Sequence, residues 1–353
     1  MTYPGDVSRY LCSVIVPVYN GSATVEHCLD ALAQQSIDPA HYEIILIDDG
    51  STDNTQQVIA QWCQRHPHIQ CQQGSQPNQG PAAARNRGAK LAQSPLLLFT
   101  DADCRPSATW IETFYQRFAQ DESISAAMGA YASVQSTPAA QFAQLEFEER
   151  YIHMRQQPAL DLVATYSAAF RRNVFLQEQG FDPAFPKANN EDVEFSYRLS
   201  QQGYRMVFVP AAVVTHPHAP TWWGYASTKF SRAYWRTVVY KRYPTKAIKD
   251  SYTPQTLKLQ IVLAPLALLG LLWTLSQRRW AGLGLCAPFL LTTIPMVRFA
   301  ARQRAGIAVW VPWGLWLRSL VFALGVGWAL VTSQPAQKTV RPQAGAASGD
   351  TTR

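Results

Sequence analysis

Apolar strand patterns alternate with helix patterns in the first part of the chain, and this alternation restricts the fold more than any other feature. Strand patterns occur in "CSVIVPVYN", "YEIILIDDGSTD" and "PLLLFTDAD". Residues 23–35, 55–65 and 82–92 read as helices that follow or precede these strands. Strands separated by helices of this length predict an α/β fold with a mainly parallel, doubly wound sheet.

Acidic residues follow the last of these strands. Asp101 and Asp103 stand two residues apart, so in an extended chain both carboxylates point to the same side. Ligands of doubly wound sheets bind beyond the carboxyl ends of the strands. The pair therefore predicts a site for a hard divalent cation, Mg²⁺ or Mn²⁺, and a solvated turn is the alternative.

The charge of the chain is unevenly distributed. Residues 1–220 hold 14 Lys and Arg against 22 Asp and Glu, a net charge of −8, whereas residues 221–353 have a net charge of +15. A basic half suits nucleic acid or an anionic membrane. The membrane is favoured by three apolar runs, residues 259–275, 280–297 and 307–332. Each is near the length of about 20 residues that crosses a bilayer. No nucleic-acid partner is expected.

Several prolines interrupt these runs, so we expect two to three spans, with the first two runs as full spans or as a hairpin. A buried helical subdomain is the alternative. Arg318 lies within the third run, where it is expected to pair with another helix, to snorkel or, as one hypothesis, to meet an acceptor phosphate.

Aromatic and basic residues are interleaved in "TWWGYASTKFSRAYWRTVVYKRYP", a mixture typical of a helix at a membrane interface. The positive charge before the first apolar run predicts a cytoplasmic catalytic domain on a multi-pass protein of the inner (plasma) membrane. The N-terminus lacks a signal-peptide pattern. We therefore divide the chain into a soluble domain (1–220), an interfacial amphipathic segment (221–255), transmembrane helices (256–332) and a disordered tail (333–353).

The six cysteines are scattered, with no CxxC pair. This spacing disfavours a zinc cluster and fits free thiols in a reducing compartment.

Five motifs in register resemble those of family 2 glycosyltransferases: "VIVPVYN", "ILIDDGSTDNT", "NQGPAAARNRG", "FTDADC" and "NNEDVEFSYRL". The resemblance covers about residues 10 to 220. It implies a GT-A (Rossmann-like) domain that binds a nucleotide diphosphate sugar, commonly of UDP, GDP or dTDP. It further implies transfer of the sugar to an acceptor hydroxyl with inversion.

The resemblance also assigns candidate donor-binding residues. It implies that Asp101 and Asp103 contact the metal and the ribose, that Asp49 contacts the base or ribose, and that Pro17 and Tyr19 line the nucleotide pocket. Arg85 is placed near the nucleotide or its diphosphate, with a structural ion pair to Asp49 or Asp101 as the alternative. Many relatives have Glu directly after "YN", whereas Gly21 and Ser22 stand here.

Inversion requires a base that takes the proton of the acceptor. The resemblance implies Asp192 as this base, with Glu191 binding the acceptor or orienting the site. Acids placed favourably against a helix dipole are the alternative for this pair. His216 is a candidate additional metal ligand, with His218 or a purely structural histidine as alternatives.

The leading function is therefore metal-assisted, inverting transfer to a membrane-associated acceptor, either a lipid, a polyprenyl phosphate or a glycan precursor. A processive polysaccharide synthase is the enzyme alternative, although "SRAYWR" has Tyr234 where those relatives carry Arg before Trp. A non-catalytic membrane scaffold is the alternative of another class.

Overall fold

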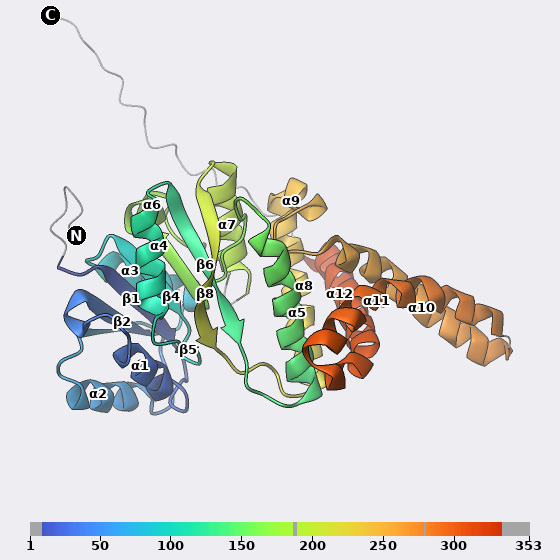
Figure 1. Ribbon diagram of the computed structural model, residues 1–353, viewed down its shortest axis with the longest axis horizontal. Helices are drawn as coiled ribbons and strands as arrows, with labels where there is room; N and C mark the ends of the chain where they lie inside the picture. The colour runs from blue at the N-terminus through green and yellow to red at the C-terminus, as the bar shows by residue number, and fades with distance from the viewer. Residues whose placement is uncertain (1–8, 186–188, 279, 334–353) are drawn as a thin grey trace, which may run out of the picture.

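The computed structural model describes residues 9–185, 189–278 and 280–333, and its N-terminal part, called the soluble part after the predicted domain, is built on one eight-stranded mixed sheet (Figure 1). The strand order is β3-β2-β1-β4-β7-β6-β8-β5. In chain order the strands are β1 (Cys12–Val18), β2 (Tyr42–Asp48), β3 (Cys71–Ser75), β4 (Leu96–Thr100), β5 (Arg105–Pro106), β6 (Ile124–Ala132), β7 (Ser167–Arg171) and β8 (Arg205–Thr215).

The first half of this sheet is parallel, as the alternation of strands and helices predicts. β1 pairs in parallel with both β2 and β4, and β2 pairs in parallel with β3. β2 and β4 are buried along their whole length, which fits strands covered on both faces. The second half is mixed, because β7 runs antiparallel between β4 and β6. The predicted α/β fold with a mostly parallel sheet is confirmed.

Helices connect and cover these strands. They are α1 (Val25–Ala33), the short 3₁₀ helix η1 (Pro39–His41), α2 (Thr55–Arg65), α3 (Pro81–Leu91), α4 (Trp110–Gln120), α5 (Pro138–Arg155), α6 (Arg172–Gln177) and α7 (Glu191–Gln201). α3 lies close against β1 because its facing residue is Gly88, where an added Cβ would stand 2.5 Å from Ile15 Cγ2. This close approach brings the first turns of α3 to the carboxyl end of the sheet.

The C-terminal part is helical. It contains α8 (Trp222–Arg242), α9 (Pro244–Ile248), α10 (Gln255–Gln277), η2 (Trp280–Leu285), α11 (Cys286–Gln303), η3 (Ala305–Trp310) and α12 (Val311–Thr332). Three helical segments, 255–277, 280–303 and 305–332, are long and apolar enough to cross a membrane. α10 and α11 pack together as a hairpin that extends away from the soluble part, whereas α12 packs along α8 (Figure 1). Of the predicted tail, all but Ser333 lies outside the described residues.

A second apolar cluster joins the soluble part to the C-terminal helices. Phe142 and Leu145 of α5 pack with Tyr225 of α8 and with side chains of α10, α11 and α12. Arg318 of α12 is buried beside this cluster, where it donates to Glu146 Oε1 (2.8 Å) and to Gln260 Oε1 (2.6 Å). The paired arrangement expected for an arginine in an apolar helix is thus present. Arg318 does not line the cleft described below, so the structure lends no support to the hypothesis that it meets an acceptor phosphate, which stays untested.

Candidate active site

A cleft of about 1370 Å³ opens at the carboxyl ends of β1, β2 and β4 and continues toward α8, α10 and α12. Parallel strands direct the loops at these ends to one edge of the sheet, which is why distant motifs meet there. The cleft is lined by nine candidate site residues of the sequence analysis: Pro17, Tyr19, Asp49, Arg85, Asp101, Asp103, Glu191, Asp192 and His216.

Arg85 links two of these groups. Its side chain is 1% exposed, and it donates to Asp101 Oδ1 (2.6 Å) and to Glu191 Oε1 (2.7 Å). The ion-pair alternative therefore describes Arg85 better than a free diphosphate contact, and Glu191 is a partner that the sequence did not indicate. The guanidinium fixes the carboxyl end of β4 against the beginning of α7.

Asp101 and Asp103 converge as their spacing predicts. Their carboxylates and the Cys104 thiol bring ligand atoms within 4.8 Å of one another. His216 Nε2 lies 3.2 Å from Asp103 Oδ2, and the buried His216 Nδ1 has no hydrogen-bond partner in the described part of the chain. Burial raises the pKa of the Cys104 thiol well above its ordinary value, so no thiolate is available there near neutral pH. Two carboxylates and an imidazole remain, a donor set in which the carboxylate oxygens suit Mg²⁺ or Mn²⁺.

The other candidate histidine, His218, is directed elsewhere. It is buried, its ring stacks on Phe147, and its Nε2 lies 2.9 Å from Gln144 Oε1. Burial and the neighbouring His216 lower the pKa of His218 to about 4. This is the structural histidine that the sequence analysis allowed, and only His216 lies beside the paired acids.

The nucleotide end of the cleft is formed by β1, β2 and the loop before α3. Asp49 is buried, and its two carboxylate oxygens accept hydrogen bonds from Gln76 Nε2, Gln79 N and Gly80 N at 2.8–3.0 Å. Asp49 thus holds this loop in place as well as lining the cleft. Tyr19, in contrast, is half exposed at the cleft edge. Asp48 points to the opposite side, where Gln56 and Ser51 donate to it.

Glu191 and Asp192 begin α7 and differ in their surroundings. Glu191 is buried, accepting from Arg85 and from the backbone N–H of Asn189 at 2.6 Å. Burial and the adjacent Asp192 raise the pKa of Glu191 to about 7, although Arg85 opposes this shift.

Asp192 is partly exposed in the cleft, and its Oδ1 accepts from Val193 N at 2.8 Å. Burial raises the pKa of Asp192 against the opposing charges of Arg85 and Arg236. Asp192 is therefore the more accessible carboxylate of the pair.

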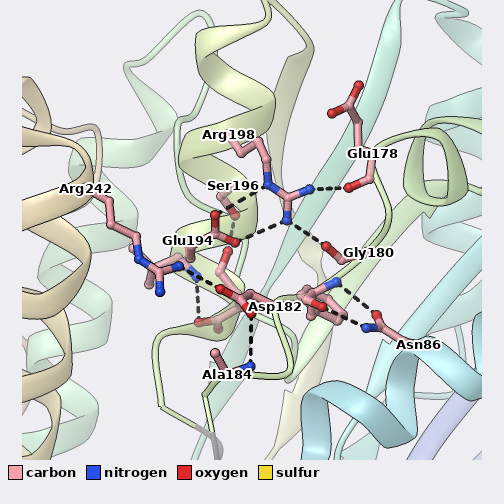
Figure 2. Close-up of polar contacts among 12 residues, drawn as sticks. Asn86, Glu178, Gly180, Asp182, Ala184, Glu194, Ser196, Arg198 and Arg242 are labelled. Carbon is pink, nitrogen blue, oxygen red and sulfur yellow. Dashed lines mark hydrogen bonds and ion pairs between the residues drawn. The ribbon is translucent and has the colours of Figure 1, made fainter. Parts of the chain in front are cut away.

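The loop before α7 is held from three sides (Figure 2). Asn86 of α3 donates to Phe181 O and accepts from Phe181 N, while Arg242 of α8 pairs with Asp182 at 2.7 Å. Arg198 of α7 donates to the carbonyls of Glu178 and Gly180 and pairs with Glu194. These contacts hold residues 178–182 against α3, α7 and α8.

Sequence reasoning placed the basic residues of α8 at a membrane interface, whereas the structure places four of them in the wall of the cleft: Lys229, Arg232, Arg236 and Lys241. Lys229 is buried and pairs with Glu146 at 2.7 Å, and burial lowers its pKa to about 7. The spacing of three and four residues between Lys229, Arg232 and Arg236 is the signal that puts these three on one helix face. The aromatic residues between them concealed that signal.

The profile of Glycosyl transferase family 2 matches residues 13–177. The domain that contains these residues belongs to glycosyltransferase family 2. It is a nucleotide-sugar glycosyltransferase with a GT-A fold, which confirms the family, the fold and the enzyme class predicted from the motifs.

Curated relatives include the glycosyltransferase AglE of Haloferax volcanii, 25% identical over 220 residues, which are 59% of this chain and 67% of AglE. Validoxylamine A glucosyltransferase of Streptomyces hygroscopicus subsp. limoneus is 28% identical over 58% of this chain and 51% of its own length. The chain thus spans between about half and two thirds of these two relatives.

Among solved structures, the mannosyltransferase PcManGT from Pyrobaculum calidifontis, in complex with GDP-Man and Mn²⁺, has a TM-score of 0.59 at 22% identity. The match covers 93% of this chain and 89% of that structure. It supports the fold of this glycosyltransferase over nearly the whole chain.

Proposed function

We propose that this glycosyltransferase moves a sugar, with inversion, from a nucleotide diphosphate sugar to a hydroxyl of a membrane-associated acceptor. The observation that carries the proposal is the position of Asp192, which is accessible in the same cleft as the paired acids Asp101 and Asp103. A base and a donor site that share one cleft can act on the same anomeric carbon. The apolar helices support the membrane-associated acceptor, because they continue the wall of that cleft.

Asp192 takes the proton of the acceptor hydroxyl while the oxygen forms its bond to the anomeric carbon. The bond between that carbon and the diphosphate oxygen breaks, and its electron pair leaves with the nucleotide diphosphate. Glu191 does not compete for this role, because Arg85 and the Asn189 N–H occupy its two carboxylate oxygens. It orients the beginning of α7, and thereby Asp192.

Asp101, Asp103 and His216 would hold a divalent cation, Mg²⁺ or Mn²⁺, and such a cation supplies positive charge that stabilises the departing diphosphate. The relative PcManGT, which was solved with GDP-Man and Mn²⁺, supports this assignment. Arg232 lines the cleft, and its backbone carbonyl accepts from Asn190 Nδ2, whereas its guanidinium has no hydrogen-bond or ion-pair partner among the described residues. It is therefore free to contact the donor diphosphate.

The test is transfer by the full chain in nanodiscs, with a panel of UDP, GDP and dTDP sugars and membrane lipid extract. We expect a discrete glycolipid whose new linkage, analysed by NMR, has the anomeric configuration opposite to that of the donor. Retained configuration would contradict the proposed role of Asp192. A long polymer would instead support a processive synthase.

A further inference from the structure

The cleft is larger than one donor requires. Small-molecule sites usually enclose roughly 300–1,000 Å³, whereas this cleft holds about 1370 Å³. Its apolar half is formed by residues of α10 and α12: Leu257, Ile261, Phe322, Val326 and Leu330. This half of the cleft suits a hydrocarbon chain, and it lies on helices long and apolar enough to enter a membrane.

Positive charge lines the same cleft. Arg236, Lys241 and Lys258 line the cleft, and none of them forms an ion pair within residues 9–185, 189–278 and 280–333. Arg236 donates only to neutral groups, Asn190 Oδ1 at 2.8 Å and Tyr197 OH at 3.2 Å. Lys241 donates to Ser333 and to the Ala329 carbonyl, and Lys258 donates to the Ile248 carbonyl.

The acid beside this group is Asp250, and its carboxylate is already engaged. It accepts from the hydroxyls of Tyr197, Tyr240 and Thr253 and from backbone N–H groups at Tyr252 and Thr253. Three cations that line an apolar cleft without carboxylate partners favour an anionic ligand.

Resting on the proposed function, we propose that the acceptor is an anionic lipid with a phosphate between its chain and its reactive hydroxyl. The hydrocarbon chain of this lipid lies between α8, α10 and α12. Its phosphate lies beside Arg236, Lys241 and Lys258, and its hydroxyl reaches Asp192. Group transfer itself is unchanged, with the hydroxyl proton going to Asp192 and the electron pair of the broken bond to the nucleotide diphosphate.

The probe is hexadecyl phosphate, a chain with a phosphate and no acceptor hydroxyl, titrated by native mass spectrometry against the full chain in phosphatidylcholine nanodiscs. Two comparison compounds are titrated in the same way. Butyl phosphate lacks the long hydrocarbon chain, and hexadecanol lacks the charged phosphate. We expect hexadecyl phosphate to bind about 100-fold or more tightly than butyl phosphate, because of the buried methylene groups, and about tenfold or more tightly than hexadecanol. Equal binding of butyl phosphate would mean a free-phosphate site, and equal binding of hexadecanol would mean an apolar site. Either result overturns the proposal.

The variant that tests the residues is Lys241→Gln with Lys258→Gln. Its matched control, Lys249→Gln with Arg302→Gln, removes two exposed cations that do not line the cleft. We expect about tenfold or weaker binding of hexadecyl phosphate by the first variant only, with nucleotide-sugar binding unchanged in both. Val326→Trp, which fills the apolar half, should abolish the preference for the long chain. If the first variant binds hexadecyl phosphate as the control does, the proposal fails, whereas failure of nucleotide-sugar binding by the wild type would overturn the proposed function itself.

Discussion

Arg85 offers the sharpest test of how the site is held together. Arg85→Gln removes a buried guanidinium and leaves Glu191 and Asp101 without their cation. Breaking a buried ion pair by removing one partner usually costs about 3–5 kcal/mol. The lower end applies here for two reasons. The Asp101 side chain is 30% exposed, and Glu191, whose pKa is already raised to about 7, can take up a proton instead of remaining as a buried charge.

A loss of about 3 kcal/mol corresponds to a fall in melting temperature of about 6–12 °C for a large domain. The matched control is Arg87→Gln, which removes an arginine from the exposed side of the same helix. We expect the control to change stability by less than about 0.5 kcal/mol. Arg85→Lys should lie between the two, because it keeps the charge but loses the fork that reaches both carboxylates. Intrinsic fluorescence during heating of the purified chain in nanodiscs measures all three variants.

The same substitution changes the pH dependence of transfer. Arg85 lowers the pKa values of Glu191 and Asp192, so its removal raises both further. A base is active only when deprotonated, and turnover should therefore begin to rise at a higher pH in Arg85→Gln than in the wild type. If the melting temperature and the acidic limb of the pH profile both match those of Arg87→Gln, Arg85 does not organise the site.

Three further predictions concern the metal, the sheet and the membrane. Asp103→Ala should abolish transfer and weaken binding of the metal-loaded donor with the fold intact, and unchanged activity in EDTA would remove the metal-assisted mechanism. Gly129→Ala should destabilise the chain by about 1–3 kcal/mol, because an added Cβ would stand 2.1 Å from Ala212 O, whereas Gly327→Ala, with open space around it, should not. Thermal melting distinguishes the two. A reporter fused after Arg353 should lie across the membrane from the catalytic domain, and a cytoplasmic signal would show that the number of crossings is even.

The spacing of apolar residues along the sequence was enough to predict individual helices and strands. The segment Thr55–Arg65 forms α2 with the predicted bounds, and the buried run at Ile44 lies within β2. The meeting of Asp49, Asp101 and Asp192 in one cleft also follows from sequence, because parallel strands place their carboxyl ends together and the family motifs identify the residues.

Other features depend on the path of the whole chain. Arg85 and Glu191 are separated by 106 positions, and Arg318 and Glu146 by 172, so no local spacing reports either pair. The antiparallel β7 was not predicted, because "SAAFR" has too few residues to show a strand pattern. The cations of α8 fit both a membrane interface and a cleft wall, and only the packing of α8 distinguishes the two.

The most direct test of the proposed mechanism is the turnover of Asp192→Asn measured beside its affinity for the nucleotide sugar. Asp161→Asn is the matched control, because Asp161 lies outside the cleft and pairs with Lys246. If Asp192 is the base, its variant should bind donor with nearly unchanged affinity and turn over about 100-fold or more slowly, while the control keeps its turnover. Normal turnover by Asp192→Asn, or a collapse of its donor affinity, would contradict the assignment.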